Sequence, residues 1–349
     1  MDKKQSTITP ALPKNPLCSV CIANYNGLEY IAECLDSILS QNFGYNIEIL
    51  VHDDVSTDDS VSYIKEHYPQ VKVLESIENV GFCISNNRMV AEAKGKYILL
   101  LNNDAALRKN ALATLYKASL EYGEGIYGLP QFNAQTGELI DIGSIFDLFF
   151  NPIPNTNKKR NDVGMIIGAC LWLPKTLWDK IGGFPEWFGS MAEDMYICCV
   201  ARLWGVPVRA LTESGFDHRV GESFGGGKVL QDGGLATTVK RRTLSERNKT
   251  FVMIITCPAP AAYLLVPFHL FMLTLEGLLL SLVKMNKSIF LDIYWNCLVQ
   301  IRDYGEILRK TRKFVQTERR IGSVKFLQPF SLIPYKLKMF IIYGIPYIK

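Results

Sequence analysis

The chain has 349 residues, of which 48% are hydrophobic and 21% are charged. It is long enough for one large domain or two ordinary ones, and this composition excludes a chain that is disordered throughout. The net charge of +4 is unevenly spread: residues 284–349 hold 13 Lys or Arg and 4 Asp or Glu, a net of +9, which leaves −5 for residues 1–283. A mildly acidic body with a basic end predicts contact with an anionic membrane surface, and no nucleic-acid partner is expected.

The nine cysteines form no zinc or disulfide framework. Cys18 and Cys21 have CxxC spacing but lie in an apolar, strand-like run without a second pair, so we expect them to be buried. Scattered thiols are typical of a reducing compartment. The first residues lack the apolar core of a signal peptide. We therefore expect a cytoplasmic location, on the inner face of the inner membrane, as a peripheral or monotopic protein.

Strand and helix patterns alternate after a loose leader at residues 1–16. Strands are expected at 17–23, 47–51, 71–74 and 97–101, and helices at 28–41, 61–67 and 81–93. This order predicts a doubly wound, mostly parallel α/β sheet, in which ligands bind at the carboxyl ends of the strands. Residues 132–161 are rich in Asn, Pro and Gly and are expected to form loops.

The composition changes after residue 245. Residues 251–275 carry no formal charge if His269 is neutral, and they are long enough to span a bilayer. However, Pro258, Pro260 and Pro267 interrupt this stretch. For residues 246–349 we therefore favour helices lying in the membrane interface, with a single spanning helix or a helical subdomain packed on the body as alternatives.

Polar residues stand at the ends of three predicted strands: Asn24, Asp53, and the triplet from Asn102 to Asp104. A carboxylate at such a place can accept hydrogen bonds from a base or a ribose. One carboxylate with neighbouring amides is also enough for Mg²⁺ or Mn²⁺ when a diphosphate supplies the other ligands. An ordinary turn would explain each stretch taken alone.

Two further stretches carry candidate chemistry. Glu193 and Asp194 open a predicted helix, where they either favour the helix dipole or shift each other's pKa so that one becomes a general base. His218 lies in a polar stretch that continues into a glycine-rich run at residues 221–227. It is either structural or a ligand.

In this order, these pieces resemble the family 2 glycosyltransferases with the GT-A fold, in particular the bacterial rhamnosyltransferase-like branch. The resemblance extends from about residue 17 to 227 and implies a GT-A domain at 17–245, followed by a hydrophobic and basic helical region at 246–349. It rests on seven stretches: 19–27 (SVCIANYNG), 53–58 (DDVSTD), 78–87 (ENVGFCISNN), 101–104 (LNND), 182–184 (GGF), 193–194 (ED) and 218–223 (HRVGES).

The resemblance also implies roles for single residues. Asp53 would bind the base of a nucleotide sugar, Asp104 with Asn102 would hold Mg²⁺ or Mn²⁺ and the diphosphate, and His218 would complete the metal site. Asp194 would be the general base, while Glu193 would shape the site or hold an acceptor. The nucleotide-sugar site would comprise Ala23, Asn24, Asn26, Asp53, Asn79, Gly81, Asn87, Asn102, Asn103 and Asp104.

Two departures from the family pattern matter. Asn102 replaces the first Asp of a strict DxD motif, which implies a modest metal affinity. In the helix after Asp194, Tyr196 and Val200 stand where the family often has an Asp and an Arg. Those two would pair with each other at helical spacing, so their joint absence leaves Asp194 as the base candidate.

The resemblance implies an inverting, metal-dependent transferase that moves a sugar, with dTDP-rhamnose favoured, to a hydroxyl of a lipid-linked or polysaccharide acceptor in bacterial cell-surface glycan synthesis. Expected partners are the nucleotide-sugar donor, a glycan or polyprenyl-diphosphate-linked acceptor, and anionic lipids. The alternatives are a UDP-sugar-dependent transferase, a catalytically inactive nucleotide-binding scaffold and an integral membrane carrier. The sequence leaves the oligomeric state open, a homo-oligomer included.

Overall fold

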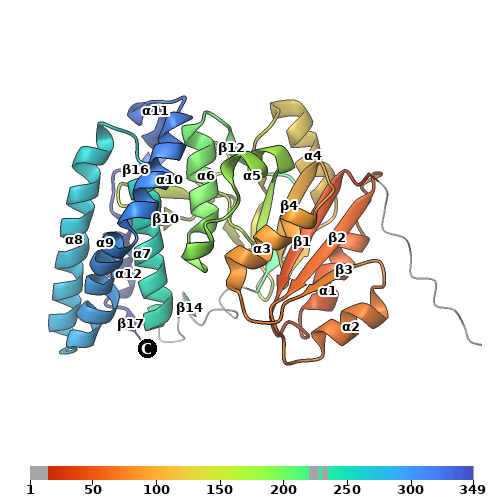
Figure 1. The fold of residues 1–349 in the computed structure, drawn as a ribbon, viewed down its shortest axis with the longest axis horizontal. Helices are drawn as coiled ribbons and strands as arrows, with labels where there is room; N and C mark the ends of the chain where they lie inside the picture. The colour runs from red at the N-terminus through yellow and green to blue at the C-terminus, as the bar shows by residue number, and fades with distance from the viewer. Residues whose placement is uncertain (1–14, 220–227, 230–234, 349) are drawn as a thin grey trace, which may run out of the picture.

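The computed structural model describes residues 15–219, 228–229 and 235–348 (Figure 1). Most of the expected leader and the glycine-rich run at 221–227 lie outside the described residues. An α/β half, built around one large sheet, occupies the right of the view, and the C-terminal helices stand together on the left.

The central sheet has seven strands in the order β12-β6-β11-β4-β1-β2-β3. Within it β11 runs antiparallel to its neighbours β4 and β6, while the other pairs are parallel. The predicted α/β class with a mostly parallel sheet is therefore confirmed. The strands are β1 (Cys18–Asn24), β2 (Ile47–Asp53), β3 (Lys72–Glu75), β4 (Tyr97–Asn102), β6 (Ile126–Gly128), β11 (Cys170–Pro174) and β12 (Val208–Ala210).

Successive strand residues point to opposite faces of the sheet. Because the residues on both faces are apolar, helices cover both faces. Val20 and Leu99 join one core with α1 (Ile31–Leu39) and α4 (Ala111–Tyr122). Cys21 and Leu100 join a second core on the other face. The helices there are α3 (Gly81–Glu92), α5 (Lys175–Ile181) and α6 (Glu193–Leu203), while α2 (Ser60–His67) connects β2 to β3.

The loops expected at 132–161 are wrong in part, because this region contains short strands. In a second sheet of order β5-β13-β7-β8, the strands are β5 (Ala105–Leu107), β13 (Phe216–His218), β7 (Gln131–Asn133) and β8 (Leu139–Asp141). A third sheet joins β9 (Ile145–Asp147) to β10 (Pro152–Ile153) and to β16 (Phe330–Ser331). Two or three residues are too few to produce a readable alternation, so composition alone indicated loops.

The C-terminal region is helical. Pro258 and Pro260 separate its first two helices, whereas Pro267 lies inside α8 and does not interrupt it. The expected boundary at residue 245 falls within α7. The elements are α7 (Val239–Thr256), α8 (Ala261–Val283), the π-helical η2 (Ile289–Trp295), α9 (Asn296–Asp303), α10 (Gly305–Thr317), α11 (Ser323–Leu327) and α12 (Tyr335–Tyr343), with the short strands β14 (Lys228–Val229), β15 (Leu235–Thr237) and β17 (Tyr347–Ile348).

Candidate active site

The predicted strand-end residues meet at one edge of the central sheet. Strand β1 lies between β4 and β2, and its register pairs Ala23 with Asn102 and Asn24 with Asp53. Because the three strands are parallel, their carboxyl ends face the same side, which is the usual place for a ligand in such a sheet.

A network of side-chain hydrogen bonds fixes the end of β2. Asp53 is buried and accepts three hydrogen bonds, from Asn24 Nδ2 at 2.9 Å, from the Ser56 backbone N–H at 2.9 Å and from Ser56 Oγ at 2.5 Å. Asn103 Nδ2 donates to Asn24 Oδ1 at 3.0 Å, and Asn26 Oδ1 accepts from the Thr57 N–H at 2.7 Å. A carboxylate has about four lone-pair positions, so Asp53 is oriented by these donors and keeps capacity for a further one.

Asp54 positions the next loop, a role that the sequence did not predict. Its carboxylate accepts from the backbone N–H groups of Val80 at 2.7 Å and Gly81 at 2.9 Å, and its backbone oxygen accepts from Asn79 Nδ2 at 3.2 Å. Asn79 and Gly81 are thereby drawn to the end of β2. The available signal was its position directly after Asp53.

Asn87 lies on α3 and not at one of the strand ends. Its Nδ2 donates to the backbone oxygen of Phe184 at 2.9 Å, and its Oδ1 accepts from the Phe184 N–H at 2.9 Å. This amide therefore connects α3 to the chain segment that leads to Glu193 and Asp194. Its contact with a donor sugar stays a prediction.

His218 ends β13, which pairs with β5 in the second sheet, and Asp104 directly precedes β5. His218 Nε2 is 3.2 Å from Asp104 Oδ1 and 3.3 Å from Asn102 Nδ2, and both His218 and Asp104 are 7% exposed. On the other side of the ring, Gln131 Nε2 lies 2.8 Å from Nδ1. Gln131 was not predicted, because it stands far from the other motifs in the chain.

These side chains fit the expected metal ion by chemistry. A carboxylate, an imidazole and an amide suit Mn²⁺ or Mg²⁺ when waters and phosphate oxygens complete the coordination. The described residues contain no group of three or more His, Cys, Asp or Glu that could hold a metal ion by themselves. The set therefore fits an ion shared with a ligand and does not fit a closed structural site.

Asp194 is joined to the same region through the segment before β11. The backbone N–H of Gly168 donates to Asp194 Oδ2 at 2.9 Å, and the next residue, Ala169, accepts at its backbone oxygen from the Asn102 N–H at 3.1 Å. The Met195 N–H donates to Asp194 Oδ1 at 2.7 Å. Gly168 thus contacts the predicted base Asp194, and its neighbour Ala169 contacts the end of β4.

The two buried carboxylates of this pair have different surroundings. Burial, followed by the charge of Asp194, raises the pKa of Glu193 to about 8, and Glu193 Oε2 has no hydrogen-bond partner among the described residues. Burial also raises the pKa of Asp194, but two backbone N–H groups favour its charged form. Two N–H donors therefore favour the charged form of Asp194, so these surroundings favour Asp194 over Glu193 as the proton acceptor of the pair.

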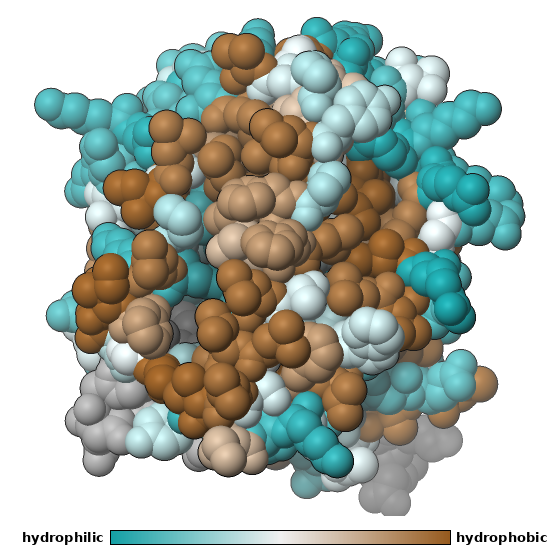
Figure 2. Space-filling view, turned by 90° about the vertical axis from the view of Figure 1, so that its left-hand side faces the viewer, coloured by the Kyte–Doolittle hydropathy of each residue, from teal (hydrophilic) through white to brown (hydrophobic). Residues whose placement is uncertain are grey.

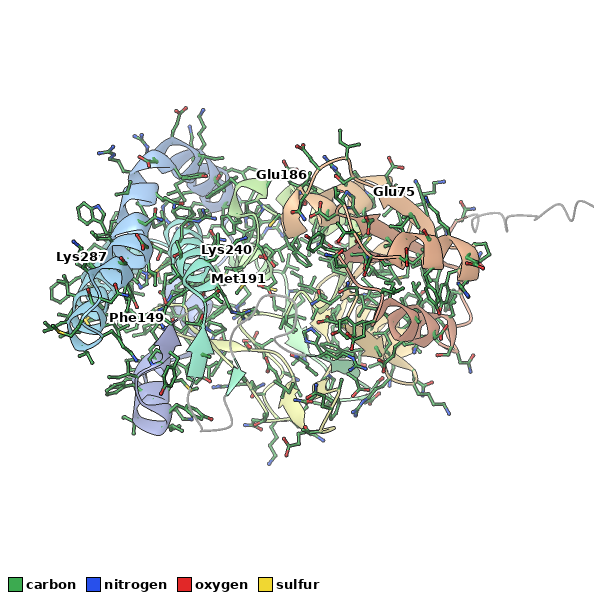
Figure 3. The ribbon with its side chains drawn as sticks, turned by 90° about the horizontal axis from the view of Figure 1, so that it is seen from below. Glu75, Phe149, Glu186, Met191, Lys240 and Lys287 are labelled. Atoms are coloured by element: carbon green, nitrogen blue, oxygen red, sulfur yellow. The ribbon has the colours of Figure 1, made fainter. Side chains whose placement is uncertain are left out.

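Helix α7 holds the loop that leads into α6. Asn248 Nδ2 lies 2.8 Å from the backbone oxygens of Ser190 and Met191, and Arg247 donates to that of Phe188 at 2.8 Å. Met191 has φ 73° and Ala192 φ 64°, values that residues other than glycine rarely adopt. Figure 3 shows Met191 in the middle of the molecule, between the sheet half and the helices.

Comparison with known proteins agrees with this geometry. Residues 19–182 match the family model described as Glycosyl transferase family 2. Chondroitin synthase from Escherichia coli is 34% identical over 202 residues, which are 56% of this chain and 28% of that protein. This chain therefore spans less than a third of the length of that curated relative.

Two solved structures share the fold at 15% sequence identity each. GalNAc-T7, solved with UDP, GalNAc and Mn²⁺, superposes with a TM-score of 0.64 over 95% of this chain and 59% of the other. The mannosyltransferase PcManGT from Pyrobaculum calidifontis, solved with GDP-Man and Mn²⁺, gives a TM-score of 0.50 over 87% and 86%. The family model therefore identifies residues 19–182 as a family 2 glycosyltransferase domain, and the solved structures show that the chain has the GT-A fold.

Proposed function

We propose that this chain is an inverting glycosyltransferase that moves a sugar from a nucleotide-sugar donor to an acceptor hydroxyl in cell-surface glycan synthesis. The observation that carries the proposal is that one short segment contacts both the predicted base and the strand end at the predicted diphosphate site. Gly168 holds the carboxylate of Asp194, while Ala169 binds the end of β4 beside Asp104. A predicted base and a predicted diphosphate site therefore lie on opposite sides of one short segment.

In this proposal the sugar is transferred in one displacement. The acceptor hydroxyl oxygen attacks the anomeric carbon while the bond from that carbon to the diphosphate oxygen breaks. The hydroxyl proton passes to Asp194, and the nucleoside diphosphate leaves with the bonding electron pair. Attack from the face opposite the leaving group inverts the configuration. The two N–H donors at Asp194 orient its carboxylate and favour its charged form, as this role requires.

Asp104, Asn102 and His218 would hold a divalent metal ion, which when bound neutralises negative charge on the departing diphosphate. Asp53 would accept hydrogen bonds from the base or the ribose, with Asn24 and Asn103 keeping it in place. GalNAc-T7 and PcManGT were both solved with Mn²⁺, which supports the metal, and with UDP and GDP-Man respectively, which supports a nucleotide-sugar donor.

The resemblance to the rhamnosyltransferase-like branch favours dTDP-rhamnose as the donor, and the acceptor we propose is a glycan or a polyprenyl-diphosphate-linked sugar. A thermal-shift screen tests the donor, because a ligand that binds only the folded state raises the melting temperature. Purified protein is compared with dTDP-rhamnose, UDP-sugars and GDP-mannose, each with and without Mn²⁺. We expect one nucleotide class to give a Mn²⁺-dependent shift, followed by donor hydrolysis or transfer.

The screen also separates the alternatives. A Mn²⁺-dependent shift with neither hydrolysis nor transfer to any lipid-linked or polysaccharide acceptor would favour the inactive scaffold. No shift with any nucleotide would contradict the proposed function.

A further inference from the structure

Helix α8 combines the composition of a membrane helix with an unusual position. This helix of 23 residues is long and apolar enough to cross a membrane. Only 17% of its most apolar 18-residue stretch is buried in the protein. It stands at the outer edge of the molecule (Figure 1). A core helix of this composition would be covered on most sides.

The exposed side chains of α8 recur at helical spacing along its whole length. Leu264 is 73% exposed, Phe271 63% and Leu282 69%. Figure 2 looks onto this side of the molecule and shows a broad hydrophobic surface. Monomeric soluble proteins rarely expose an apolar area of this extent without a partner for it. The exposed residues that share this face are Leu264, Phe268, Phe271, Leu275, Leu278 and Leu282.

The opposite face of α8 is fastened to the protein by polar groups. Glu276 accepts from Arg242 at 2.6 Å and from Lys336 at 2.8 Å, and His269 Nε2 lies 2.9 Å from Thr250 Oγ1. Burial opposes the charged form of Glu276, but Lys336 and Arg242 outweigh it and lower the pKa of this carboxyl. A helix that crossed the bilayer would lose these partners and carry Glu276 into hydrocarbon, which is strongly unfavourable.

Helix α12 is attached to the same polar cluster. Lys336 at its start contacts Glu276 of α8 and, through its Nζ, Glu246 of α7 at 2.5 Å. Ile341, further along α12, is 74% exposed. Phe149, whose ring lies 5.6 Å from that of Phe268 on α8, is also at this end of the molecule (Figure 3). Lys336 therefore ties α12, which exposes apolar residues of its own, to the polar inner face of α8.

Charge identifies the surface that would cover this face. Residues 284–349 carry a net charge of +9, and Lys287 in the connection after α8 and Lys338 on α12 are exposed. Anionic lipid headgroups attract basic residues, while their acyl chains take up Leu and Phe side chains. A second copy of the chain would bring two ends of like charge together, which disfavours a dimer through this face.

We infer that α8 and α12 form a monotopic docking face for a bilayer containing anionic lipids, with α8 lying along the membrane surface. The polar inner face stays on the protein and the apolar outer face enters the boundary between headgroups and acyl chains. This orientation separates the inference from the alternative of a single spanning helix.

Vesicle sedimentation tests the docking face. The full chain is mixed with phosphatidylcholine vesicles, with and without phosphatidylglycerol, and compared with the double variant Phe271→Glu/Leu278→Glu. We expect stronger binding to the anionic vesicles, and a loss of about tenfold or more in the variant because two large apolar groups are no longer buried. Leu120→Glu is the matched control, since Leu120 on α4 is also exposed, at 66%, but lies in the sheet half. Equal binding by the variant, or a wild-type dimer that the variant dissociates without any vesicle binding, would overturn the inference.

Depth measurements test the orientation. All nine native cysteines are buried, so single cysteines placed at 264, 271 and 278 can be labelled selectively with a polarity-sensitive fluorophore. These positions cover about 20 Å of helix axis. For a helix on the surface we expect quenching by lipid-attached quenchers at one shallow depth for all three labels. A depth that changes steadily from 264 to 278, passing the centre of the bilayer, would show a spanning helix and refute the docking mode.

Discussion

The side-chain amide of Asn248 donates a hydrogen bond of 2.8 Å to the backbone oxygen of Met191. This contact ties α7 to the loop that aims Glu193 and Asp194, at a point where Met191 and Ala192 both have positive φ. Such a backbone conformation persists only where surrounding contacts hold it. Helix α7 therefore helps to position the predicted base Asp194 and its neighbour Glu193.

Replacement of Asn248 by Asp should misplace the base. The aspartate keeps the size of the side chain but cannot donate to the oxygens of Ser190 and Met191. We expect kcat for sugar transfer to fall about 10-fold to 100-fold while the affinity for the nucleotide changes little, because a small displacement of a catalytic group is enough for such a loss. Steady-state kinetics with nucleotide titration measures both, and Asn161→Asp on the exposed surface is the control. An equal loss of nucleotide affinity would argue for general unfolding.

Gln131 should tune the metal site through His218. Its amide nitrogen lies 2.8 Å from Nδ1 of His218, on the side of the ring away from Asp104. When His218 binds a metal through Nε2, Nδ1 carries the ring proton and the Gln131 amide turns its oxygen to accept it. Loss of such an accepting partner typically weakens metal binding about 10-fold to 100-fold. We therefore expect Gln131→Ala to weaken Mn²⁺-dependent nucleotide binding by this factor, and His218→Ala at least as much, while binding without metal is unchanged. Calorimetric titration measures this, with the exposed His67→Ala as control. Unchanged Mn²⁺ dependence in both variants would remove His218 from the metal site.

Glu193 should make the stability of the protein depend on pH. Burial and Asp194 raise its pKa to about 8, well above its ordinary value of 4.5. Between these two pH values the unfolded chain loses this proton and the folded protein keeps it, so stability falls as pH rises through this window. Each unit of pKa difference corresponds to about 1.4 kcal/mol. Glu193→Gln removes the effect, so the variant should gain stability relative to the wild type between pH 5 and pH 8. Urea unfolding at several pH values measures it, and parallel curves would contradict the assignment.

Gly277 should be required for the docking of α8. A Cβ atom at this position would lie 2.4 Å from Cγ of Tyr294, far inside contact distance. We expect Gly277→Ala to lower the free energy of unfolding by about 1–3 kcal/mol, as overpacking does in a filled core. Gly305→Ala is the matched control, because nothing lies within 4 Å of a Cβ there and Gly305 is also helical. That change should stabilise the protein or leave it unaffected, as followed by thermal unfolding. Equal effects of the two would mean that α8 packs differently.

The sequence predicted the sheet and the site where long periodic segments and strand ends carried the signal. β1, β2 and β4 are buried runs that end at Asn24, Asp53 and Asn102. Because parallel strands share one ligand-binding edge, the sequence alone predicted that these residues lie close together. The boundaries of α3 and α6 were close for the same reason. In each case the local pattern of apolar and polar residues was enough to predict the element.

The sequence could not predict contacts made across long separations. Gly168, Gln131 and Asp54 act through backbone groups or a side-chain amide whose importance depends on the partner brought beside them. The short strands between 131 and 153 are also too brief for a periodic pattern. In the C-terminal region, Pro267 was expected to interrupt the apolar stretch, but it lies inside α8 and the helix continues through it.

The role of Asp194 as the base in sugar transfer is tested most directly by Asp194→Asn. The measurement is turnover of the nucleotide sugar identified by the thermal-shift screen, with nucleotide affinity determined on the same protein and Asp179→Asn on α5 as an exposed control. We predict that Asp194→Asn lowers kcat by about 10²-fold to 10⁴-fold, as expected for loss of a general base, while the nucleotide still binds. Turnover within a fewfold of the wild type, with binding intact, would contradict the account.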